Sequence, residues 1–298
     1  MVDTPTSIKK FQFRHLNTNT IRQLDVGWAR IALLSAAPYS IHEASDHAVW
    51  GLSFARQRGV HSVGSSGRRQ DFDAWPGELA ITEPGVSIFS ESEHGGEYLT
   101  VHLQRTAPKL GIDLAVEGKW AAPRSVFPGD REALRLGWQL RKLLLATSPQ
   151  TELVEGHTAL LVAHGQSRLR STSQGPRDKP RNRYATDRQA LAKVLQHIQD
   201  ALDAPLPLLE LAQTANMEPL RFLRSFTRAL GCTPHAYVLE ARLQKARELM
   251  RNTDDSLAAI AIDCGFAHQS HLGAALKQRL GTTPLACRQL DVLPGVSG

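Results

Sequence analysis

Hydrophobic and polar residues alternate along the chain between positions 75 and 104, and dipeptides that favour turns separate the alternating stretches. An alternation with period two is typical of half-buried strands. Short strands joined by glycine-containing turns predict a small β-barrel or β-sandwich. The alternating apolar positions are Leu79 and Ile81, Val86 and Ile88, and Leu99, Val101 and Leu103.

The hydrophobic period lengthens after position 130, where the pattern predicts two amphipathic helices over residues 130–147 and 151–165. Helices of this kind either pack back on the β domain or form a dimer seam, and the sequence leaves both arrangements open. The apolar stripes are Leu136, Leu140, Leu143 and Leu144 in the first helix and Leu153, Leu160 and Leu161 in the second.

The C-terminal part of the chain repeats one helix ending. "RALGCTP" at 228–234 returns 50 residues later as "QRLGTTP" at 278–284, with Leu, Gly, Thr and Pro in common. In each copy a short apolar helix with a small alanine precedes a turn and a second helix. That second helix ends at Leu-Gly, where glycine adopts the left-handed conformation. The repeat therefore predicts two helix-turn-helix units. The other matching stretches are "LLELAQTANM" from 208 with "LAAIAIDCGF" from 257, and "FLRSFTR" from 222 with "LGAALKQ" from 272.

Residues at the turns and helix starts agree with this interpretation. Asn216 and Gly265 tolerate a positive φ in the turns. Pro219 suits the first position of a helix, and Ser256 is a good N-cap. Residues 234–256 have helical spacing and predict one long connecting helix. Such a helix would hold two recognition helices about 34 Å apart, so that they enter successive major grooves of a duplex.

The stretch from about 188 to 288 resembles the DNA-binding domain of the AraC/XylS family of bacterial transcription regulators. The region before it resembles the cupin-like effector and dimerisation domain of that family. The implied fold class is α+β, with an N-terminal cupin-like β-barrel or sandwich, trailing helices, and a C-terminal all-α domain of two helix-turn-helix units joined by a long helix. The stretches that carry the resemblance are "LAQTANM", "FLRSFTRALGCTPHAYVLEARLQKARELM", "IAIDCGFAHQSHL" and "LKQRLGTTPLACR".

The expected divisions are a cupin-like domain over 1–164, a basic flexible linker over 165–186, the DNA-binding domain over 187–290 and a tail over 291–298. The net charge of +6 is concentrated in the linker, which has six basic residues and one acidic residue. Its Gly, Pro, Ser and Arg content cannot bury enough surface to offset the entropy of ordering. Its cations form either a solvated tether or a loose phosphate contact that gains from counterion release.

The composition limits the class of protein further. Hydrophobic residues make up 42% of the chain and charged residues 21%, which excludes wholesale disorder. No apolar run is long enough to cross a bilayer, and residues 1–10 lack the apolar core of a signal peptide. We therefore expect a cytoplasmic protein without membrane contact. The three scattered cysteines, Cys232, Cys264 and Cys287, are expected as reduced packing residues.

In the first recognition helix, Phe222 and Phe226 lie four residues apart and should face the core. The opposite face then meets DNA, and arginine reads guanine through its O6 and N7 atoms. The family resemblance implies that Leu220, Leu223 and Arg224 occupy base-facing positions. The expected contact residues of this helix are Leu220, Arg221, Leu223, Arg224 and Arg228.

The second recognition helix has a different character. Its N-terminus can meet a phosphate through backbone N–H groups, and Gln269 can pair with adenine. Gly273 and Ala274 stand where the resemblance implies Ser-Arg; alanine cannot donate to a base, and glycine weakens a helix by about 1 kcal/mol. We expect the first unit to supply most base discrimination and the second mainly phosphate contacts. The expected contact residues are His268, Gln269, Ser270, His271 and Lys277.

The candidates for an effector pocket in the mouth of the N-terminal barrel are Trp50, Phe54, Trp75 and Ile88, although aromatic core packing explains them equally well. The histidines of this region lack the dense His-x-His-plus-Glu cluster of metal-binding cupins, and no catalytic motif occurs. We expect no metal, no cofactor and no enzymatic activity.

These observations predict a sequence-specific transcription regulator that binds double-stranded DNA, probes two successive major grooves and is controlled by a small-molecule effector. The resemblance implies an activator that contacts RNA polymerase and a homodimer. Two alternatives stay open. One is an effector-independent regulator whose N-terminal domain only dimerises, and the other is a cupin-type metalloenzyme with an appended DNA-binding domain.

Overall fold

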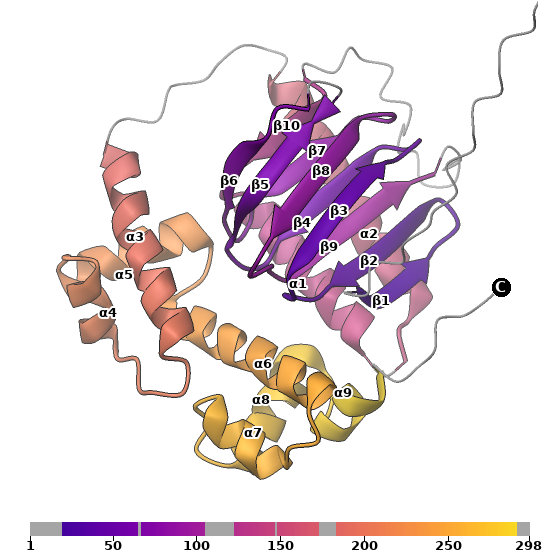
Figure 1. The fold of residues 1–298 in the computed structure, drawn as a ribbon. Helices are drawn as coiled ribbons and strands as arrows, with labels where there is room; N and C mark the ends of the chain where they lie inside the picture. The colour runs from indigo at the N-terminus through magenta and orange to yellow at the C-terminus, as the bar shows by residue number, and fades with distance from the viewer. Residues whose placement is uncertain (1–19, 65–66, 105–121, 147, 173–182, 291–298) are drawn as a thin grey trace, which may run out of the picture.

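The computed structural model describes residues 20–64, 67–104, 122–146, 148–172 and 183–290. The N-terminal part consists of two antiparallel sheets (Figure 1), with strand orders β1-β2-β9-β4-β7-β10 and β3-β8-β5-β6. The three strands predicted from the alternating pattern are confirmed as β7, β8 and β9. The strands are β1 Thr20–Asp25, β2 Ala29–Leu34, β3 Tyr39–Ala44, β4 Val49–Ser53, β5 Gln57–Val63, β6 Gln70–Ala74, β7 Leu79–Thr82, β8 Ser87–Ser92, β9 Tyr98–Leu103 and β10 Arg124–Phe127.

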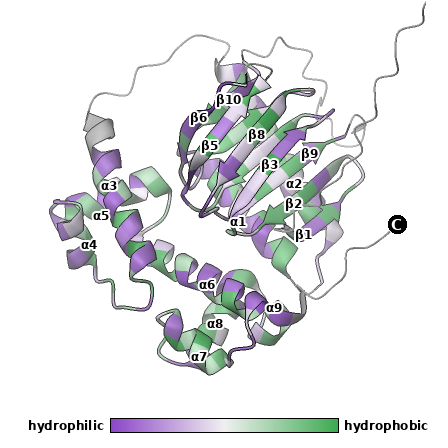
Figure 2. Cartoon of the chain, in the orientation of Figure 1, coloured by the Kyte–Doolittle hydropathy of each residue, from purple (hydrophilic) through white to green (hydrophobic). Residues whose placement is uncertain are grey.

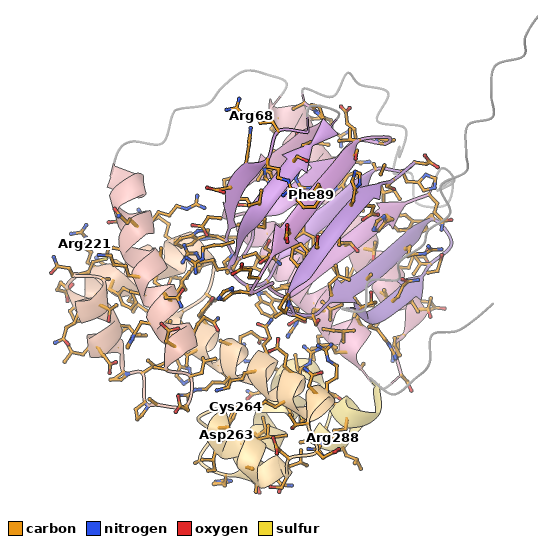
Figure 3. The ribbon with its side chains drawn as sticks, in the orientation of Figure 1. Arg68, Phe89, Arg221, Asp263, Cys264 and Arg288 are labelled. Atoms are coloured by element: carbon orange, nitrogen blue, oxygen red, sulfur yellow. The ribbon has the colours of Figure 1, made fainter. Side chains whose placement is uncertain are left out.

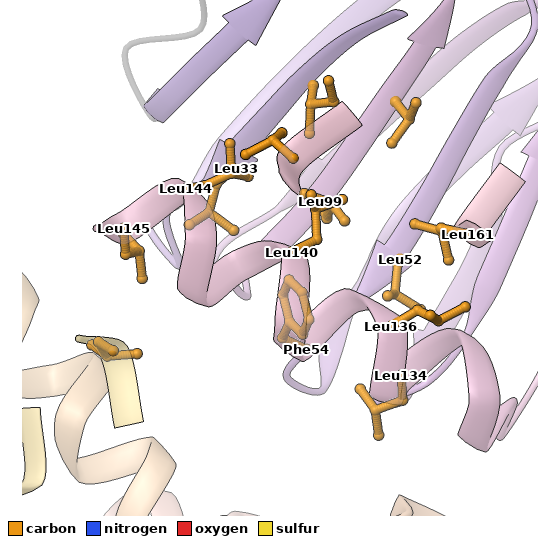
Figure 4. Close-up of a cluster of buried hydrophobic side chains, with 14 of the residues drawn as sticks. Leu33, Leu52, Phe54, Leu99, Leu134, Leu136, Leu140, Leu144, Leu145 and Leu161 are labelled. Atoms are coloured by element: carbon orange, nitrogen blue, oxygen red, sulfur yellow. The ribbon is translucent and has the colours of Figure 1, made fainter. Parts of the chain in front are cut away.

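Two helices, α1 (Arg131–Leu145) and α2 (Thr151–Thr172), pack against the six-stranded sheet and close its core. Figure 4 shows Leu136 and Leu140 of α1 among side chains from the sheet. The helices approach the sheet closely because glycines face it. A Cβ atom at Gly137 would overlap Leu52, and one at Gly165 would overlap the Trp50 ring. The two helices therefore pack back on the β domain, which is one of the two arrangements that the sequence leaves open.

The predicted apolar stripe of α2 is wrong in part. Leu153 and Leu160 are 45% and 55% exposed, whereas Val154, Leu161 and Val162 are buried. The buried face is shifted because small residues, Gly165 among them, turn toward the sheet. The spacing of the leucines alone does not predict the contact between Gly165 and the sheet.

Helix α2 also runs past the predicted start of the linker, so residues 165–172 are helical. Arg168 pairs with Asp130 at 3.1 Å and covers the Phe127 ring at 5.2 Å, because the helix carries it onto the β domain. This arginine is therefore part of the N-terminal packing rather than of a solvated tether. Residues 173–182 of the predicted linker, and the tail over 291–298, lie outside the described residues.

The C-terminal part is all-α and contains the two predicted helix-turn-helix units, α4–α5 and α7–α8, joined by α6 (Figure 1). Asn216 and Gly265 take positive φ values of 52° and 73° in the two turns, and Gly231 and Gly281 cap α5 and α8 with φ values of 72° and 70°. The helices are α3 Arg183–Asp200, α4 Leu208–Thr214, α5 Pro219–Leu230, α6 Pro234–Asn252, α7 Leu257–Asp263, α8 Gln269–Leu280 and α9 Pro284–Leu290.

Hydrophobic and hydrophilic residues alternate around these helices (Figure 2), and each unit buries its apolar side in a different cluster. The first unit packs with α3, where Phe222 and Phe226 stack edge to face at 5.5 Å and Phe226 meets Tyr237 at 5.7 Å. The second unit shares one continuous cluster with α1 and the sheet, through residues such as Leu272 and Leu276. The two units are thus anchored in different ways.

A buried cluster of four charges joins the two parts of the chain. Arg141 of α1 is 1% exposed and donates to both carboxylate oxygens of Glu97, at 2.7 and 2.6 Å. It also pairs with Glu240 of α6 at 2.8 Å, and Arg247 of α6 pairs with Glu97 at 3.2 Å. Burial alone would raise the pKa of Glu97, but the two guanidinium groups outweigh burial and lower it. The cluster has two cations and two anions, so α6 is held to the β domain without an unpaired buried charge.

No helix in the described part of the chain combines the length and apolar character needed to cross a membrane.

Candidate nucleic-acid interface

The N-terminus of α5 is capped by a carboxylate. Glu218 accepts hydrogen bonds from the backbone N–H groups of Leu220 and Arg221, both at 2.9 Å, and these two bonds lower the pKa of its carboxyl group. Pro219 occupies the first turn, as predicted, because that position needs no N–H donor. The helix therefore begins at a fixed point, which sets the direction of every side chain that follows.

Three apolar residues, Phe222, Phe226 and Leu230, bury one face of α5 completely. Helical geometry then turns Leu220, Arg221, Arg224 and Arg228 outward, and all four are exposed. Leu223 lies at the edge between the two faces and is half-buried. The structure brings the predicted contact residues of the first unit onto one surface, with Leu223 at its margin.

The exposed arginines of α5 differ in what holds them. Arg221 pairs with Asp187 at 3.2 Å, and Ser225 donates to the other oxygen of the same carboxylate at 3.3 Å. Figure 3 shows Arg221 on the side of this unit away from the β domain. Arg224 and Arg228 make no salt bridge with any residue that the structure describes. Sequence reasoning missed Asp187 as a partner, since its place on α3 gives no local signal.

The second recognition helix, α8, is capped differently. His268 accepts a hydrogen bond at its Nδ1 from the backbone N–H of His271, at 3.1 Å, so His268 is the N-cap. The predicted contact residues are all exposed on this helix: His268, Gln269, Ser270, His271 and Lys277.

An offset of 50 positions aligns α5 with α8, because Pro219 and Gln269 each begin a helix of 12 residues. At this offset Leu220 corresponds to Ser270, and Arg224 corresponds to Ala274. Gln269 takes the place of Pro219 in the first turn. At positions 270 and 274 the second unit therefore presents small side chains where the first presents leucine and arginine.

Helix α6 sets the spacing between the units. Its 19 residues span roughly 28 Å at 1.5 Å per residue, which is comparable to one turn of duplex, about 34 Å. Lys245 of α6 donates to the carbonyl of Asp263 at the end of α7, at 2.9 Å, and Arg242 donates to the carbonyl of Leu202 after α3, at 2.8 Å. Helix α6 thus contacts both the end of α7 and the segment that follows α3.

The four predicted pocket residues do not line one cavity in the described structure. Trp50 is 1% exposed in the core beside α2. Trp75 lies between the guanidinium groups of Arg56 and Arg188, at 5.6 and 5.0 Å, where α3 meets the sheet. Ile88 is half-buried on β8, opposite Glu43 and Val63. Phe54 lines a cavity between α1 and the C-terminal helices.

Comparison with known proteins identifies a helix-turn-helix domain and related transcriptional regulators. A family model described as a helix-turn-helix domain matches residues 211–290. The HTH-type transcriptional regulator ArgR of Pseudomonas aeruginosa is 27% identical over 168 residues, which is 56% of this chain and 51% of ArgR. The HTH-type transcriptional regulator MtrA of Neisseria gonorrhoeae is 31% identical over 94 residues, which is 32% of this chain and 31% of MtrA. The chain thus spans about half, or less, of the length of these relatives.

Solved structures match about a third of the chain. One is a transcriptional regulator with an AraC-type DNA-binding domain from Chromobacterium violaceum, with 27% identity and a TM-score of 0.35, covering 37% of this chain and 99% of that one. Another is the DNA-binding domain of AdpA in complex with a target DNA, with 28% identity and a TM-score of 0.33, covering 34% of this chain and 90% of that one.

Two helix-turn-helix units of equal geometry, linked by one helix, define a tandem helix-turn-helix DNA-binding domain. The family match over residues 211–290 covers most of this region, so the C-terminal part of the chain contains a helix-turn-helix domain.

Proposed function

We propose that the chain is a sequence-specific transcription regulator that inserts α5 and α8 into successive major grooves of one DNA duplex. The observation that carries this proposal is the outer face of α5, where Arg221, Arg224 and Arg228 are exposed opposite a fully buried apolar face. Arginine side chains on an exposed helix of this kind pair with guanine in the major groove.

The direct test is footprinting of the full chain on DNA upstream of its own gene, with the affinity measured at several salt concentrations. Specific binding should protect two neighbouring segments on one face of the duplex. The logarithm of the affinity should fall with the logarithm of salt, with a slope of about −0.9 per phosphate contacted. Equal affinity for the upstream DNA and for random duplex would refute sequence-specific regulation through this DNA.

A matched pair of variants makes the test specific to the proposed surface. Arg228→Ala and Arg68→Ala remove the same charge from exposed positions, but Arg68 lies on the β domain, far from α5 (Figure 3). Arg228→Ala should weaken DNA binding, whereas Arg68→Ala should leave it unchanged. Equal losses from both variants would indicate that only the net charge matters.

We propose in addition that the N-terminal domain forms a homodimer through α2. The exposed Leu153 and Leu160 lie seven positions apart on this helix, which puts them two turns apart on one face. Sedimentation analysis of Leu160→Glu should give a monomer if this face is the seam. A dimer that survives both this substitution and Leu153→Glu would place the seam elsewhere.

Control by a small-molecule effector and activation through RNA polymerase complete the proposed function, on the basis of the family resemblance. Transcription from the identified promoter, measured in vitro with purified polymerase, distinguishes an activator from a repressor. Addition of the regulator should raise the transcript level; a fall would make it a repressor.

A further inference from the structure

A cavity of about 460 Å³ lies between α1 and the C-terminal domain. Its walls come from α1, from the loops after β4 and before β7, from the first half of α6, and from the C-terminal ends of α3, α5 and α8. This volume is within the range of small-molecule sites, roughly 300–1,000 Å³. None of the residues proposed to contact DNA on the N-terminal halves of α5 and α8 lines it.

The cavity lies where the repeated helix ending meets the N-terminal domain. Arg131 of α1 donates to the carbonyl of Thr227 at 3.2 Å, one turn before Gly231. Eleven residues further along α1, Lys142 lies beside Gly281. Helix α1 therefore spans the C-terminal ends of both recognition helices, and a molecule in the cavity touches both domains at once.

Aromatic side chains form the apolar part of the wall. Phe54 and Trp138 have ring centroids 5.0 Å apart, and Tyr237 lines the cavity from α6. Burial raises the pKa of Tyr237 to about 12. Leu134 and Leu230 add aliphatic surface. A flat aromatic ring suits such a wall, because aromatic pairs gain from stacked and edge-to-face contacts beyond the area that they bury.

The charged part of the wall is cationic. Arg131, Arg135, Lys142 and Arg279 line the cavity, against a single lining carboxylate, Glu240, that is already paired with Arg141 at 2.8 Å. Arg135 is balanced by Glu132 at 2.6 Å. Lys142 and Arg279 are exposed and form no salt bridge within the described parts of the chain. They come from different domains, α1 and α8, and their charges are available to an anion.

We propose that this cavity binds an aromatic carboxylate of one or two rings, with its ring against Phe54, Trp138 and Tyr237 and its carboxylate between Lys142 and Arg279. Such a ligand bridges the N-terminal domain and the second helix-turn-helix unit. Its identity as the regulator's effector rests on the proposed function, but its binding does not require DNA. The site differs from the predicted barrel pocket, of which only Phe54 belongs to it.

The test uses 2-naphthoate as the probe, with 2-naphthamide as its uncharged counterpart of similar shape. Titration calorimetry of the full chain should give one saturable site for the naphthoate and an affinity at least about tenfold lower for the amide, because the amide offers no charge to Lys142 and Arg279. Quenching of Trp138 fluorescence should accompany binding and disappear in Trp138→Phe. Equal affinity for acid and amide, or no saturable binding, would overturn the proposal.

Charge-removal variants locate the site. Lys142→Gln and Arg279→Gln should each lower naphthoate affinity about tenfold, while Lys193→Gln, an exposed lysine on α3, should not. Full affinity in both cavity variants, with an unchanged thermal midpoint, would place the carboxylate elsewhere and refute the assignment. If the full chain protects a specific DNA site but does not bind naphthoate, the cavity proposal is wrong and the proposed function stands. If it binds naphthoate but no specific DNA, the proposed function is wrong and the cavity proposal stands.

Discussion

The two helix-turn-helix units have the same backbone plan and different surroundings. In the first, α5 presents Arg221, Arg224 and Arg228 to solvent, and its apolar side packs with α3. In the second, α8 presents Ala274 where the first unit has Arg224, and its apolar side merges with the cluster under α1. The shared elements are those that fix geometry: a positive-φ turn, a small buried alanine and a glycine cap. The surfaces are free to diverge because they do not determine the fold.

This difference suggests that the two units have different roles, one in base discrimination and one in contact with the N-terminal domain. The first unit has the exposed arginines proposed to discriminate bases, and its core includes Trp75 of the N-terminal domain beside side chains of α3–α6. The second has Ala274 where the first has Arg224, and it packs against α1 of the N-terminal domain. The buried charge cluster around Arg141 holds α6, which joins the two units, to the same domain. The unit proposed to read fewer bases packs against α1, the helix that also lines the proposed ligand cavity.

The largest expected effect comes from Arg141→Ala, which leaves Glu97 and Glu240 buried without their main partner. Breaking a buried ion pair by removing one member costs about 3–5 kcal/mol. Urea unfolding of the full chain should show a loss of this size. Hydrogen exchange in the same variant should rise more in α7–α9 than in α4–α5, since the second unit depends on α1.

The control for this prediction is Arg135→Ala on the same helix. Arg135 is exposed, and among the described residues it pairs with its neighbours Glu132 and Gln139 alone, so the unfolding midpoint should hardly move. If hydrogen exchange in Arg141→Ala rises equally in both helix-turn-helix units, the second unit does not depend on α1 more than the first unit does.

A smaller effect is expected from Arg224→Ala, measured against Gln269→Ala on an identified DNA site. Loss of a bidentate arginine–guanine pair should cost about 1–3 kcal/mol of discrimination at one base pair. Gln269→Ala should weaken binding less and more evenly across sequences, because the second unit is expected to supply mainly phosphate contacts. A greater loss of specificity from Gln269→Ala would reverse the assignment of roles.

The smallest effect concerns two glycines of the second unit. Gly273→Ala should stabilise the protein by up to about 1 kcal/mol, because alanine favours a helix more than glycine does. The nearest atom to its new Cβ would be Pro284 Cγ at 3.8 Å, an ordinary contact. Gly281→Ala should instead destabilise by about 1–2 kcal/mol, since its φ of 70° is left-handed. Thermal unfolding of both variants tests the signs; destabilisation by Gly273→Ala would mean that this glycine is needed for packing.

Much of this architecture could be predicted from local pattern. The strands β7–β9 follow from alternation, and the two C-terminal units follow from a repeat whose turns and caps obey backbone chemistry at Asn216, Pro219 and Gly231. The exposed face of α5 follows from the spacing of Phe222 and Phe226. In each case the residues that decide the structure lie within a few positions of one another.

The contacts between distant segments could not be predicted in this way. The buried face of α2 depends on Gly165 meeting Trp50, and the position of Trp75 depends on Arg56 and Arg188 from two other segments. The charge cluster joins Glu97, Arg141 and Arg247 across 150 positions of sequence. Residues so far apart leave no periodic signal in a single chain.

We propose that α5 and α8 enter neighbouring major grooves and that α5 discriminates bases more strongly than α8. The most direct test is to let the full chain select duplexes from a pool of random sequences. The account predicts two enriched blocks of sequence centred about 10–10.5 base pairs apart, one with high information content and one with low, and loss of the strong block in Arg224→Ala. A single enriched block, two blocks of equal information, or no enrichment over the starting pool would contradict it.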